Sequence, residues 1–396
     1  MCMSTVRKNE GARRQNLTEE NAVGERAPDH ALNNRFLRRW RTGLFSFSAW
    51  RIAGSLLLIF LTLTAGCSGG VNRGTSGQGG LATQEEAVSK PLPSSVVNES
   101  RGNPYTVTDD TGRKVTLLEK PLRIVSLTYG TDEILHALAG SERIVAYSRH
   151  AGDPEISFLS RSQVAKVGRR AQENAEAIYG LQPDLVVVST ATPPDLVSAL
   201  EQMGVAVYIA ASPKNVAQVK QKVRGLGRAV GEEAKTKLLL DEMDQRLTAL
   251  EKRLSAITGN RRKTAVAFTM SGPMGRKGEL FDSILQAAHV INGGASDHPL
   301  GIKGQISKEQ VVEVNPDIFI LPTWNYDSNQ DTRKFNREIA EDPAFRNLQA
   351  VQTGRMVPVS DRYRYVASHH VVDAIANIAY AVYPEVFPEG RPKDWE

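Results

Sequence analysis

The feature that most constrains this chain is a short segment that occurs twice. Residues 174–188 read NAEAIYGLQPDLVVV, and residues 307–321 read SKEQVVEVNPDIFIL. In each copy a glutamate, Glu176 or Glu309, stands seven residues before the proline of a Pro-Asp pair, and an apolar run follows at once. Apolar residues recur at helical spacing before the proline, so each copy predicts a short helix, a turn and a buried strand.

The separation of the two copies, 133 positions, is far longer than the period of a solenoid repeat. It fits two homologous lobes, and a chain of 396 residues has room for two ordinary domains of about 100–200 residues plus a tail. The alternative is coincidence, because a helix followed by a turn and a strand is common in α/β proteins.

Strands and helices are predicted to alternate around both copies. The first half opens with a hairpin at 105–117, then strands at 123–128, 143–148, 185–189 and 205–210 and helices at 131–139 (capped by Thr131), 174–181, 195–203 and 213–230. The second half has strands at 264–270, 318–322 and 356–360 and helices at 280–291, 308–314 and 366–383. This alternation predicts an α/β fold with parallel sheets covered on both faces.

A long helix is predicted between the two halves, at 232–257. The segment contains no Gly or Pro and begins with acidic residues, and one stripe carries Leu239, Met243, Leu247, Leu250 and Leu254. Such a helix would be about 39 Å long. We interpret it as a rod that joins an N-terminal lobe, 104–231, to a C-terminal lobe, 258–396; the alternative is an amphipathic helix within one domain.

The basic residues of the chain are concentrated in its first part. Residues 1–66 hold ten Lys and Arg against five Asp and Glu, and the remainder holds 39 of each sign. The formal net charge of +5 therefore belongs to a leader segment, 1–66. This distribution argues against a general nucleic-acid-binding protein.

One of the two cysteines stands at the end of an apolar run. Arg51 precedes about fifteen mostly apolar residues, and the small residues Ala65 and Gly66 come directly before Cys67. This pattern is typical of a secretion signal, and the run is short for a membrane span of about 20 residues. The segment LTAGC resembles the lipobox of bacterial lipoproteins, with Thr64 where that motif usually has Leu. The resemblance implies that Cys67 is lipidated and anchors the protein on the extracytoplasmic face of the cell membrane.

The segment that follows, 67–103, is rich in Gly, Ser, Gln and Asn and poor in large apolar residues. It cannot bury a core, so we expect a flexible linker. If the leader is removed before Cys67, no disulfide can form, because the other cysteine is Cys2.

Taken together, several segments resemble a known family. These are RIVSLTYGTDEILHALAGSERIVAYS at 123–148, the two Glu-to-Pro-Asp units, the single helical rod and SDRYRY at 360–365. They are similar to the substrate-binding lipoproteins of bacterial ABC importers for iron-siderophore complexes, haem and cobalamin, over about residues 104–388. The resemblance implies two Rossmann-like lobes with parallel-rich sheets joined by one long helix, and a ligand cleft between the lobes.

The same resemblance suggests a role for the duplicated glutamates. In that family a glutamate at the top of each lobe docks onto arginines of the membrane permease, and these positions fall on Glu176 and Glu309. Two carboxylates placed symmetrically on two lobes would suit a two-fold permease dimer. The alternative is that both are solvated first-turn acids that stabilise their helices by about 0.3–1 kcal/mol.

Candidate ligand-binding residues lie in the loops after the strands, because ligands of open α/β sheets bind beyond the carboxyl ends of the strands. These residues are Tyr129, Arg149, His150, Arg169, Arg170, Met270, Arg276, Trp324, Tyr326, Arg362, Tyr363 and Arg364. Guanidinium groups pair with carboxylate or catecholate oxygens, and aromatic rings supply flat apolar walls. We therefore predict an anionic, partly aromatic ligand such as a ferric siderophore, bound as cargo and not as a cofactor.

Haem is the nearest rival ligand. It would use Tyr129, His150, Met270, Tyr326 or Tyr363 as an iron ligand and arginines for its propionates. Cobalamin is largely neutral and gives no reason for so many arginines.

The motifs of common enzymes are missing from the sequence. The turn SLTYGTDE has one glycine, GLGRAVG at 225–231 lies inside a helical pattern, and no Gly-x-Ser-x-Gly elbow occurs. The histidines are scattered, and the adjacent His369 and His370 cannot both face one metal from a helix, so we place them on a helix surface. The sequence thus predicts a monomeric binding protein without catalytic or metal site; an enzyme on the same fold is the alternative.

Overall fold

The computed structural model describes residues 103–295, 306–325 and 331–390, all within one compact unit. The predicted leader, Cys67, nearly all of the linker and Tyr326 lie outside the described residues. The division into two domains and a connector stays a prediction, and we use "N-lobe" for 104–231 and "C-lobe" for 258–390.

The N-lobe begins with the predicted hairpin. Strands β1 (Tyr105–Thr108) and β2 (Lys114–Leu117) pair antiparallel, with Tyr105 opposite Leu117. The Asp109 carboxylate closes the turn by accepting hydrogen bonds from the backbone N–H groups of Thr111 and Arg113 at 2.9 and 3.0 Å. The hairpin prediction is confirmed.

The main N-lobe sheet has four strands in the order β4-β3-β5-β6, all parallel. Its strands are β3 (Ile124–Ser126), β4 (Ile144–Ala146), β5 (Leu185–Ser189) and β6 (Val207–Ala210). Its helices are α1 (Tyr129–Ala139), α2 (Arg161–Val167), α3 (Ala175–Tyr179), α4 (Pro194–Gln202) and α5 (Val216–Ala229), with a 3₁₀ turn, η2 (Ser141–Arg143).

The C-lobe sheet repeats this topology. Its strands are β7 (Thr264–Thr269), β8 (Gly272–Met274), β9 (Ile291–Asn292), β10 (Ile318–Leu321) and β11 (Met356–Pro358). The parallel order β9-β7-β10-β11 matches β4-β3-β5-β6, and the antiparallel β8 is added beside β7. Its helices are α7 (Leu280–Ala287), α8 (Lys308–Val314), α9 (Thr332–Ala340), α10 (Gln349–Gln352), α11 (Asp361–Arg364) and α12 (Val371–Val382), with 3₁₀ turns η3 (Gly259–Arg261) and η5 (Pro384–Val386).

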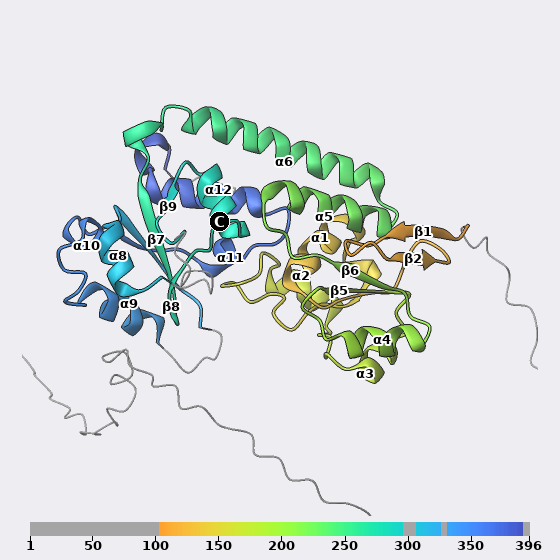
Figure 1. The fold of residues 1–396 in the computed structure, drawn as a ribbon. Helices are drawn as coiled ribbons and strands as arrows, with labels where there is room; N and C mark the ends of the chain where they lie inside the picture. The colour runs from red at the N-terminus through yellow and green to blue at the C-terminus, as the bar shows by residue number, and fades with distance from the viewer. Residues whose placement is uncertain (1–102, 296–305, 326–330, 391–396) are drawn as a thin grey trace, which may run out of the picture. The chain divides into compact units, whose positions relative to one another are not determined.

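Helix α6 (Glu233–Leu254) connects the two lobes and packs on α5 and α12 (Figure 1). Its buried stripe is Thr236, Leu240, Met243, Leu250 and Leu254. The prediction placed Leu239 and Leu247 on this stripe, but both are only half-buried in the structure. Leu240 is buried instead of Leu239. The helix is about 33 Å long at 1.5 Å per residue, slightly shorter than expected.

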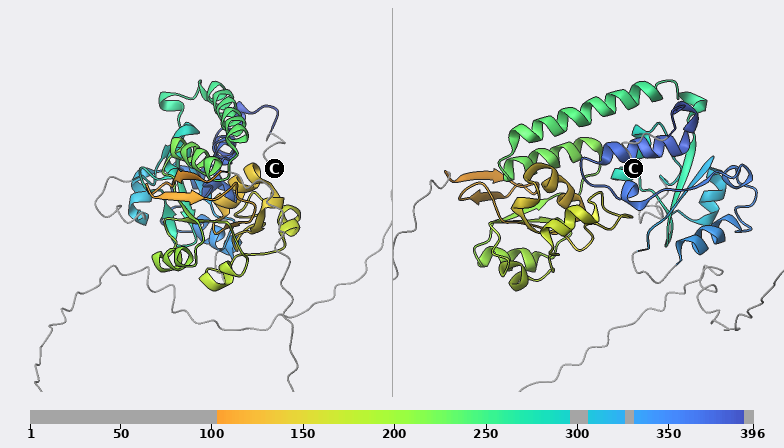
Figure 2. Two further views of the ribbon diagram at one scale, coloured as in Figure 1. Left: turned by 90° about the vertical axis from the view of Figure 1, so that its right-hand side faces the viewer. Right: turned by 180° about the vertical axis from the view of Figure 1, so that it is seen from behind.

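One hydrophobic core is shared by both lobes. In the N-lobe sheet Ile124 and Leu185 face this core, and their neighbours Val125 and Val186 face a separate cluster under α3 and α4. The C-lobe sheet is divided in the same way, and its outer cluster contains Phe268. Figures 1 and 2 show α5, α6 and α12 along the shared side, so the α/β fold with sheets covered on both faces is confirmed.

Several helix ends differ from the prediction, and those of α1, α7 and α12 differ with consequences for named residues. Helix α1 starts two residues before Thr131, because the Thr128 hydroxyl caps it by accepting from the Thr131 N–H at 3.3 Å. Helix α7 ends early, at Ala287; His289 then adopts a φ of +59°, and the chain enters β9. Helix α12 starts at Val371, so His369 and His370 precede it and do not lie on a helix surface.

Candidate functional site

Four of the predicted ligand-binding residues come together in the N-lobe. A parallel bridge between Tyr147 and Arg170 draws residues 169–171 alongside the end of β4. Arg149 and His150 follow Tyr147 by two and three positions in the chain, so the bridge places Arg169 and Arg170 beside them. All three arginines are exposed, and the Arg170 guanidinium donates to the Ala151 carbonyl at 2.8 Å. We call Arg149, His150, Arg169 and Arg170 the basic cluster.

His150 is the least exposed member of the basic cluster. Partial burial and the neighbouring Arg149 lower its pKa, and the Arg149 Nε–H donates to His150 Nε2 at 2.8 Å. The His150 ring also meets the C-lobe: the Trp324 ring lies edge-on at 5.8 Å between centroids. The predicted Trp324 therefore faces the basic cluster from the other lobe.

Tyr129 also reaches between the lobes. Its phenol O–H donates to the backbone carbonyl of Tyr365 at 3.0 Å, and burial raises its pKa well above the usual range. At physiological pH the group is therefore a neutral hydrogen-bond donor. Its neighbour Gly130 packs so closely on Ala367 that an added Cβ would lie 3.0 Å from the Ala367 carbonyl oxygen.

Two of the predicted ligand-binding residues are buried in this structure. Tyr363 and Arg364 are 1% and 2% exposed, and the Tyr363 ring packs edge-on against Phe158 of the N-lobe at 5.3 Å between centroids. The Arg364 guanidinium pairs with Asp361 at 2.7 Å and also donates to the Phe268 carbonyl and the Met274 sulfur. The short helix α11 thus places both side chains among protein neighbours, and their role as ligand contacts stays a prediction.

The other predicted C-lobe residues occupy separate positions. Arg362 is half-buried, donates to the Tyr363 hydroxyl at 3.0 Å and lies 5.3 Å from the ring of Phe158 in the N-lobe. Met270 is half-buried after β7, and Arg276 is exposed and 3.5 Å from Glu279. The structure thus brings Arg362 to the lobe interface, whereas Arg276 lies beyond β8 with a partner on its own loop.

The inter-lobe contact contains acidic and aromatic residues that sequence reasoning missed. The Glu133 carboxylate, 1% exposed, accepts from the Phe158 N–H at 3.0 Å and from the Ser368 hydroxyl of the C-lobe. Burial raises the pKa of Glu133. The Phe158 ring stacks on His370 at 4.2 Å. The pair Asp132-Glu133 near the start of α1 is visible in the sequence, but acidic residues are rarely buried, so nothing in the local sequence points to this position.

The duplicated glutamates occupy equivalent positions. Glu176 is the second residue of α3 after the capping Asn174, and Glu309 is the second residue of α8 after the capping Ser307. Both are exposed, and neither forms an ion pair with any described residue. The Glu309 N–H and the Ser307 hydroxyl lower the pKa of Glu309.

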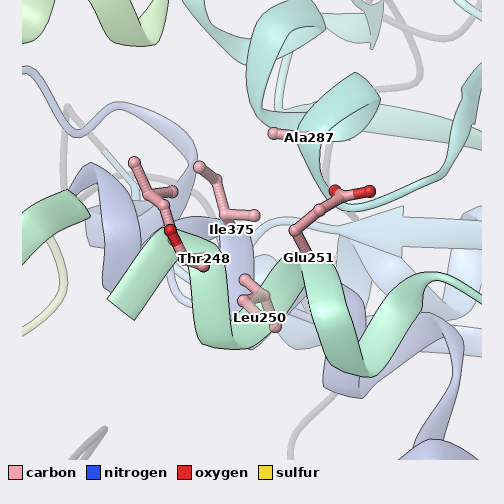
Figure 3. A pocket seen from close by; sticks show the side chains of 6 residues that line it. Thr248, Leu250, Glu251, Ala287 and Ile375 are labelled. Atoms are coloured by element: carbon pink, nitrogen blue, oxygen red, sulfur yellow. The ribbon is translucent and has the colours of Figure 1, made fainter. Parts of the chain in front are cut away.

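A groove of about 330 Å³ lies elsewhere, between α6, α7 and α12 (Figure 3). It is lined by Leu247, Thr248, Leu250, Glu251, Ala287 and Ile375. None of these residues follows the carboxyl end of a strand, so the groove is not the predicted ligand site.

Within the described ranges no group of three or more His, Cys, Asp or Glu could hold a metal ion. No helix in the same ranges is long and apolar enough to cross a membrane.

Comparison with known proteins identifies the family. The model of the periplasmic binding protein family matches residues 124–363, which is more than half of the chain. The chain belongs to this family. The family predicted from the sequence is therefore confirmed.

Curated relatives of this periplasmic binding protein are distant but cover most of its length. It is 23% identical to the uncharacterized ABC transporter substrate-binding lipoprotein YvrC of Bacillus subtilis, over 72% of the chain and 88% of that protein. It is 23% identical to a cobalamin-binding protein of Halobacterium salinarum (70% and 74% covered). It is 24% identical to the probable siderophore-binding lipoprotein YfiY of B. subtilis (65% and 80% covered).

Solved structures agree on the fold. A periplasmic binding protein from Veillonella parvula superposes with a TM-score of 0.58 at 20% identity, covering 74% of this chain and 95% of that one. At this identity the likeness establishes the fold alone.

Proposed function

We propose that this protein binds an anionic metal chelate of the ferric siderophore class between its lobes and delivers it to an ABC importer. The observation that carries the proposal is the basic cluster of the N-lobe facing Trp324 of the C-lobe, with the His150 and Trp324 rings 5.8 Å apart. Arginines supply positive charge for carboxylate or catecholate oxygens, and the indole supplies a flat apolar surface. The siderophore-binding and cobalamin-binding relatives support a chelate-sized ligand, and the three arginines favour a charged one.

Haem is the second candidate ligand. The lowered pKa of His150 favours the neutral imidazole, which is the form that coordinates iron, but its Nε2 accepts from Arg149 and would have to exchange that bond for the metal. Tyr129 is less suited to this role than predicted, because its phenol already donates to Tyr365 across the interface. Met270 remains a candidate iron ligand, and Tyr326 lies outside the described residues.

A fluorescence titration tests the ligand class. Residues 68–396 would be titrated with ferric catecholate and hydroxamate siderophores, haemin and cobalamin. We expect quenching at a Kd of about 1 μM or lower by one ferric siderophore, equivalent to roughly 8 kcal/mol of binding. Coordination of haemin, seen as a shift of its iron-dependent absorbance, would favour haem, and no response to any of the four would contradict the proposal.

Variants of the basic cluster add a direct test of the site. Arg149→Ala with Arg170→Ala should weaken siderophore binding at least tenfold, because each removed cation takes away a charged partner for the ligand. Arg333→Ala with Arg337→Ala removes two exposed arginines of α9 and serves as the matched control. Equal affinities of the two double variants would exclude the basic cluster as the site.

We further propose that Glu176 and Glu309 dock onto cationic residues of a two-fold permease dimer. Their equivalent helix positions and their exposure, without ion pairs among the described residues, support this role. The alternative role, stabilising α3 and α8 as first-turn acids, would contribute about 0.3–1 kcal/mol each.

The remaining proposals concern location and class. We propose that Cys67 is lipidated and holds the protein as a monomer at the extracytoplasmic face of the membrane, as the lipoprotein relatives support. We also infer that it is a binding protein and not an enzyme. Labelling of cells with radioactive palmitate should mark the wild-type protein and leave the Cys67→Ser variant unlabelled and released; labelling of both would contradict the anchor.

A further inference from the structure

Two carboxylates of the N-lobe reach across to the C-lobe. They lie on the loop between β4 and α2. The Trp324 Nε1–H donates to Asp153 Oδ2 at 3.2 Å, and the Thr323 hydroxyl donates to Glu155 Oε2 at 2.5 Å. All four side chains are half-buried. These bonds join the lobes on the side of the predicted ligand site, next to the basic cluster.

The C-lobe half of this contact is fixed in advance. Asp361 Oδ2 accepts hydrogen bonds from the backbone N–H groups of both Thr323 and Trp324 at 2.8 Å. The other carboxylate oxygen, Oδ1, accepts from Arg364 at 2.7 Å, and Asp361 and Arg364 are each 2% exposed. A buried ion pair therefore holds the segment that presents Thr323 and Trp324 to the N-lobe.

The N-lobe half is fixed as well. Asp153 Oδ1 accepts from the Glu155 N–H at 3.0 Å, and the Asp153 carbonyl accepts from the Ser157 N–H at 2.8 Å. Three residues after Glu155, the Phe158 N–H donates to the buried Glu133 at 3.0 Å. The turn thus aims both carboxylates at the C-lobe without help from a ligand.

We propose that Asp153 and Glu155, bonded to Trp324 and Thr323, form an inter-lobe latch that holds the predicted ligand cleft closed when no ligand is bound. Asp361 and Arg364 act as positioning residues for its C-lobe side. Because hydrogen bonds at a half-buried site contribute only modestly in net terms, each bond shifts the balance of closed and open states by about tenfold, so the latch can open reversibly.

The latch also affects binding, and this part rests on the proposed function. A ligand that binds the open state has its apparent affinity reduced by the fraction of molecules that are open. An anionic chelate would repel Asp153 and Glu155 while attracting Arg149 and Arg170 of the adjoining segments. Binding would then exchange the latch bonds for bonds to the ligand.

Trp324 itself can report the state of the latch. Residues 68–396 contain two tryptophans, Trp324 and Trp395, so Trp395→Phe leaves a single reporter. In this background without ligand, Asp153→Ala with Glu155→Ala should shift the emission to longer wavelength and increase acrylamide quenching at least twofold. Glu242→Ala with Glu313→Ala removes two exposed carboxylates elsewhere and should change neither signal.

Two milder variants at Thr323 test the latch with less risk that the protein fails to fold. Thr323→Val removes the hydroxyl that bonds Glu155 with little change of shape, whereas Thr323→Ser keeps it. Thr323→Val should reproduce part of the fluorescence change, and Thr323→Ser should resemble the wild type. Identical spectra for all of these variants would overturn the latch.

A distance measurement separates opening from a local change around the indole. The segment 68–396 contains no cysteine, so spin labels can be placed at Thr190→Cys in the N-lobe and Ser271→Cys in the C-lobe, both exposed. The latch variant should gain a longer-distance population that the wild type lacks, and an unchanged distribution would overturn the proposal. Opening together with no binding of any siderophore, haemin or cobalamin would uphold the latch and contradict the proposed ligand class.

Discussion

The carboxylate of Asp184, in the turn after α3, accepts a hydrogen bond from the backbone N–H of Arg123 at 3.0 Å, directly before the central strand β3. The second copy does the same: Asp317 accepts from the Thr264 N–H at 2.8 Å, at the first residue of the central strand β7. In both lobes the aspartate N–H also donates back to the carbonyl of the same residue, at 3.0 and 2.9 Å. In each copy the aspartate of the Pro-Asp pair thus hydrogen-bonds the turn after the helix to the start of the central strand, and we call this pair of hydrogen bonds the clamp.

This equivalence predicts matched losses of stability. Asp184→Ala and Asp317→Ala should each lower the free energy of unfolding by about 1–2 kcal/mol, because each leaves at least one backbone N–H without its acceptor. Urea denaturation of residues 68–396 would measure the free energy of unfolding of each variant. Asp195→Ala on α4 is the control, and its free energy of unfolding should lie within about 0.5 kcal/mol of the wild type. A loss in one copy only would mean that the two clamps are not equivalent.

Much of the fold could be predicted because the periodic spacing of apolar residues can be read directly from the sequence. The strand Leu185–Ser189 and the helix Lys308–Val314 appear with the expected limits. Helices α2 and α9 were missed because each buries a single apolar residue, Val164 or Ile339, so neither shows a stripe. Strand β8 is three residues long, contains Pro273 and becomes a strand only by pairing with β7, so its sequence does not predict a strand.

The site was less predictable than the fold, because burial of polar residues depends on partners distant in the sequence. The strand-end rule found Arg149, His150 and Trp324, whose positions follow from topology. It placed Arg364 facing the ligand, although Asp361 and the Phe268 carbonyl hold it inside. It also missed Asp153, because nothing in the local sequence shows that Trp324 lies opposite.

The pKa of Asp132 makes stability depend on pH. Asp132 is fully buried in α1, and burial raises its pKa to about 7, whereas an aspartate in the unfolded chain titrates near about 4. Between these values the unfolded chain has released the proton and the folded protein keeps it, so the contribution of Asp132 to stability is complete below a pH of about 4 and falls as pH rises towards about 7.

The variant Asp132→Asn tests this dependence, because the amide is uncharged and can still bond Ser148 as the carboxyl does. Relative to the wild type, it should gain stability between about pH 5 and about pH 8, by on the order of 1–3 kcal/mol. Urea denaturation at the two pH values measures the change. Glu133 also has a raised pKa and stays in the variant, so some pH dependence should persist. Parallel curves for the two proteins would contradict a proton held on Asp132.

Gly227 in α5 is required for close packing of α5 on α6. A Cβ added there would fall on the side chain of Thr236. Gly227→Ala should therefore destabilise the protein by about 1–3 kcal/mol through overpacking, although alanine is the better helix former. Thr236→Ala in the same chain should recover part of that loss, and exposed Arg224→Ala should have little effect. Additive losses in the double variant would show that the two residues do not meet.

The docking proposal separates transport from binding. In a cell that carries the cognate permease, Glu176→Ala with Glu309→Ala should abolish uptake of the ligand, whereas the purified variant should bind that ligand as tightly as the wild type. Removal of the neighbouring exposed Glu173 and Glu313 is the matched control and should leave uptake unchanged. Weaker binding by the docking variant would assign the glutamates to the ligand site instead.

The shared core limits how far the lobes can move. Helices α5, α6 and α12 contribute side chains to one apolar cluster that contacts both sheets, so a wide opening would expose that cluster to water. We expect only a small hinge motion on ligand binding, consistent with a rod-like α6. Small-angle X-ray scattering with and without ligand measures this motion, and a large change of the radius of gyration in either direction would contradict the expectation.

The same core has a consequence for biosynthesis. Helix α12 follows every strand of both sheets in the chain, yet Ala374 and Ile378 are completely buried in the cluster that also covers the N-lobe strands. Because α12 packs on α6 and α7, the C-lobe part of this cluster cannot exclude water until Ile378 has been delivered. A chain threaded through an export channel from its N-terminus would remain incompletely packed throughout the passage and would close its core only on the far side.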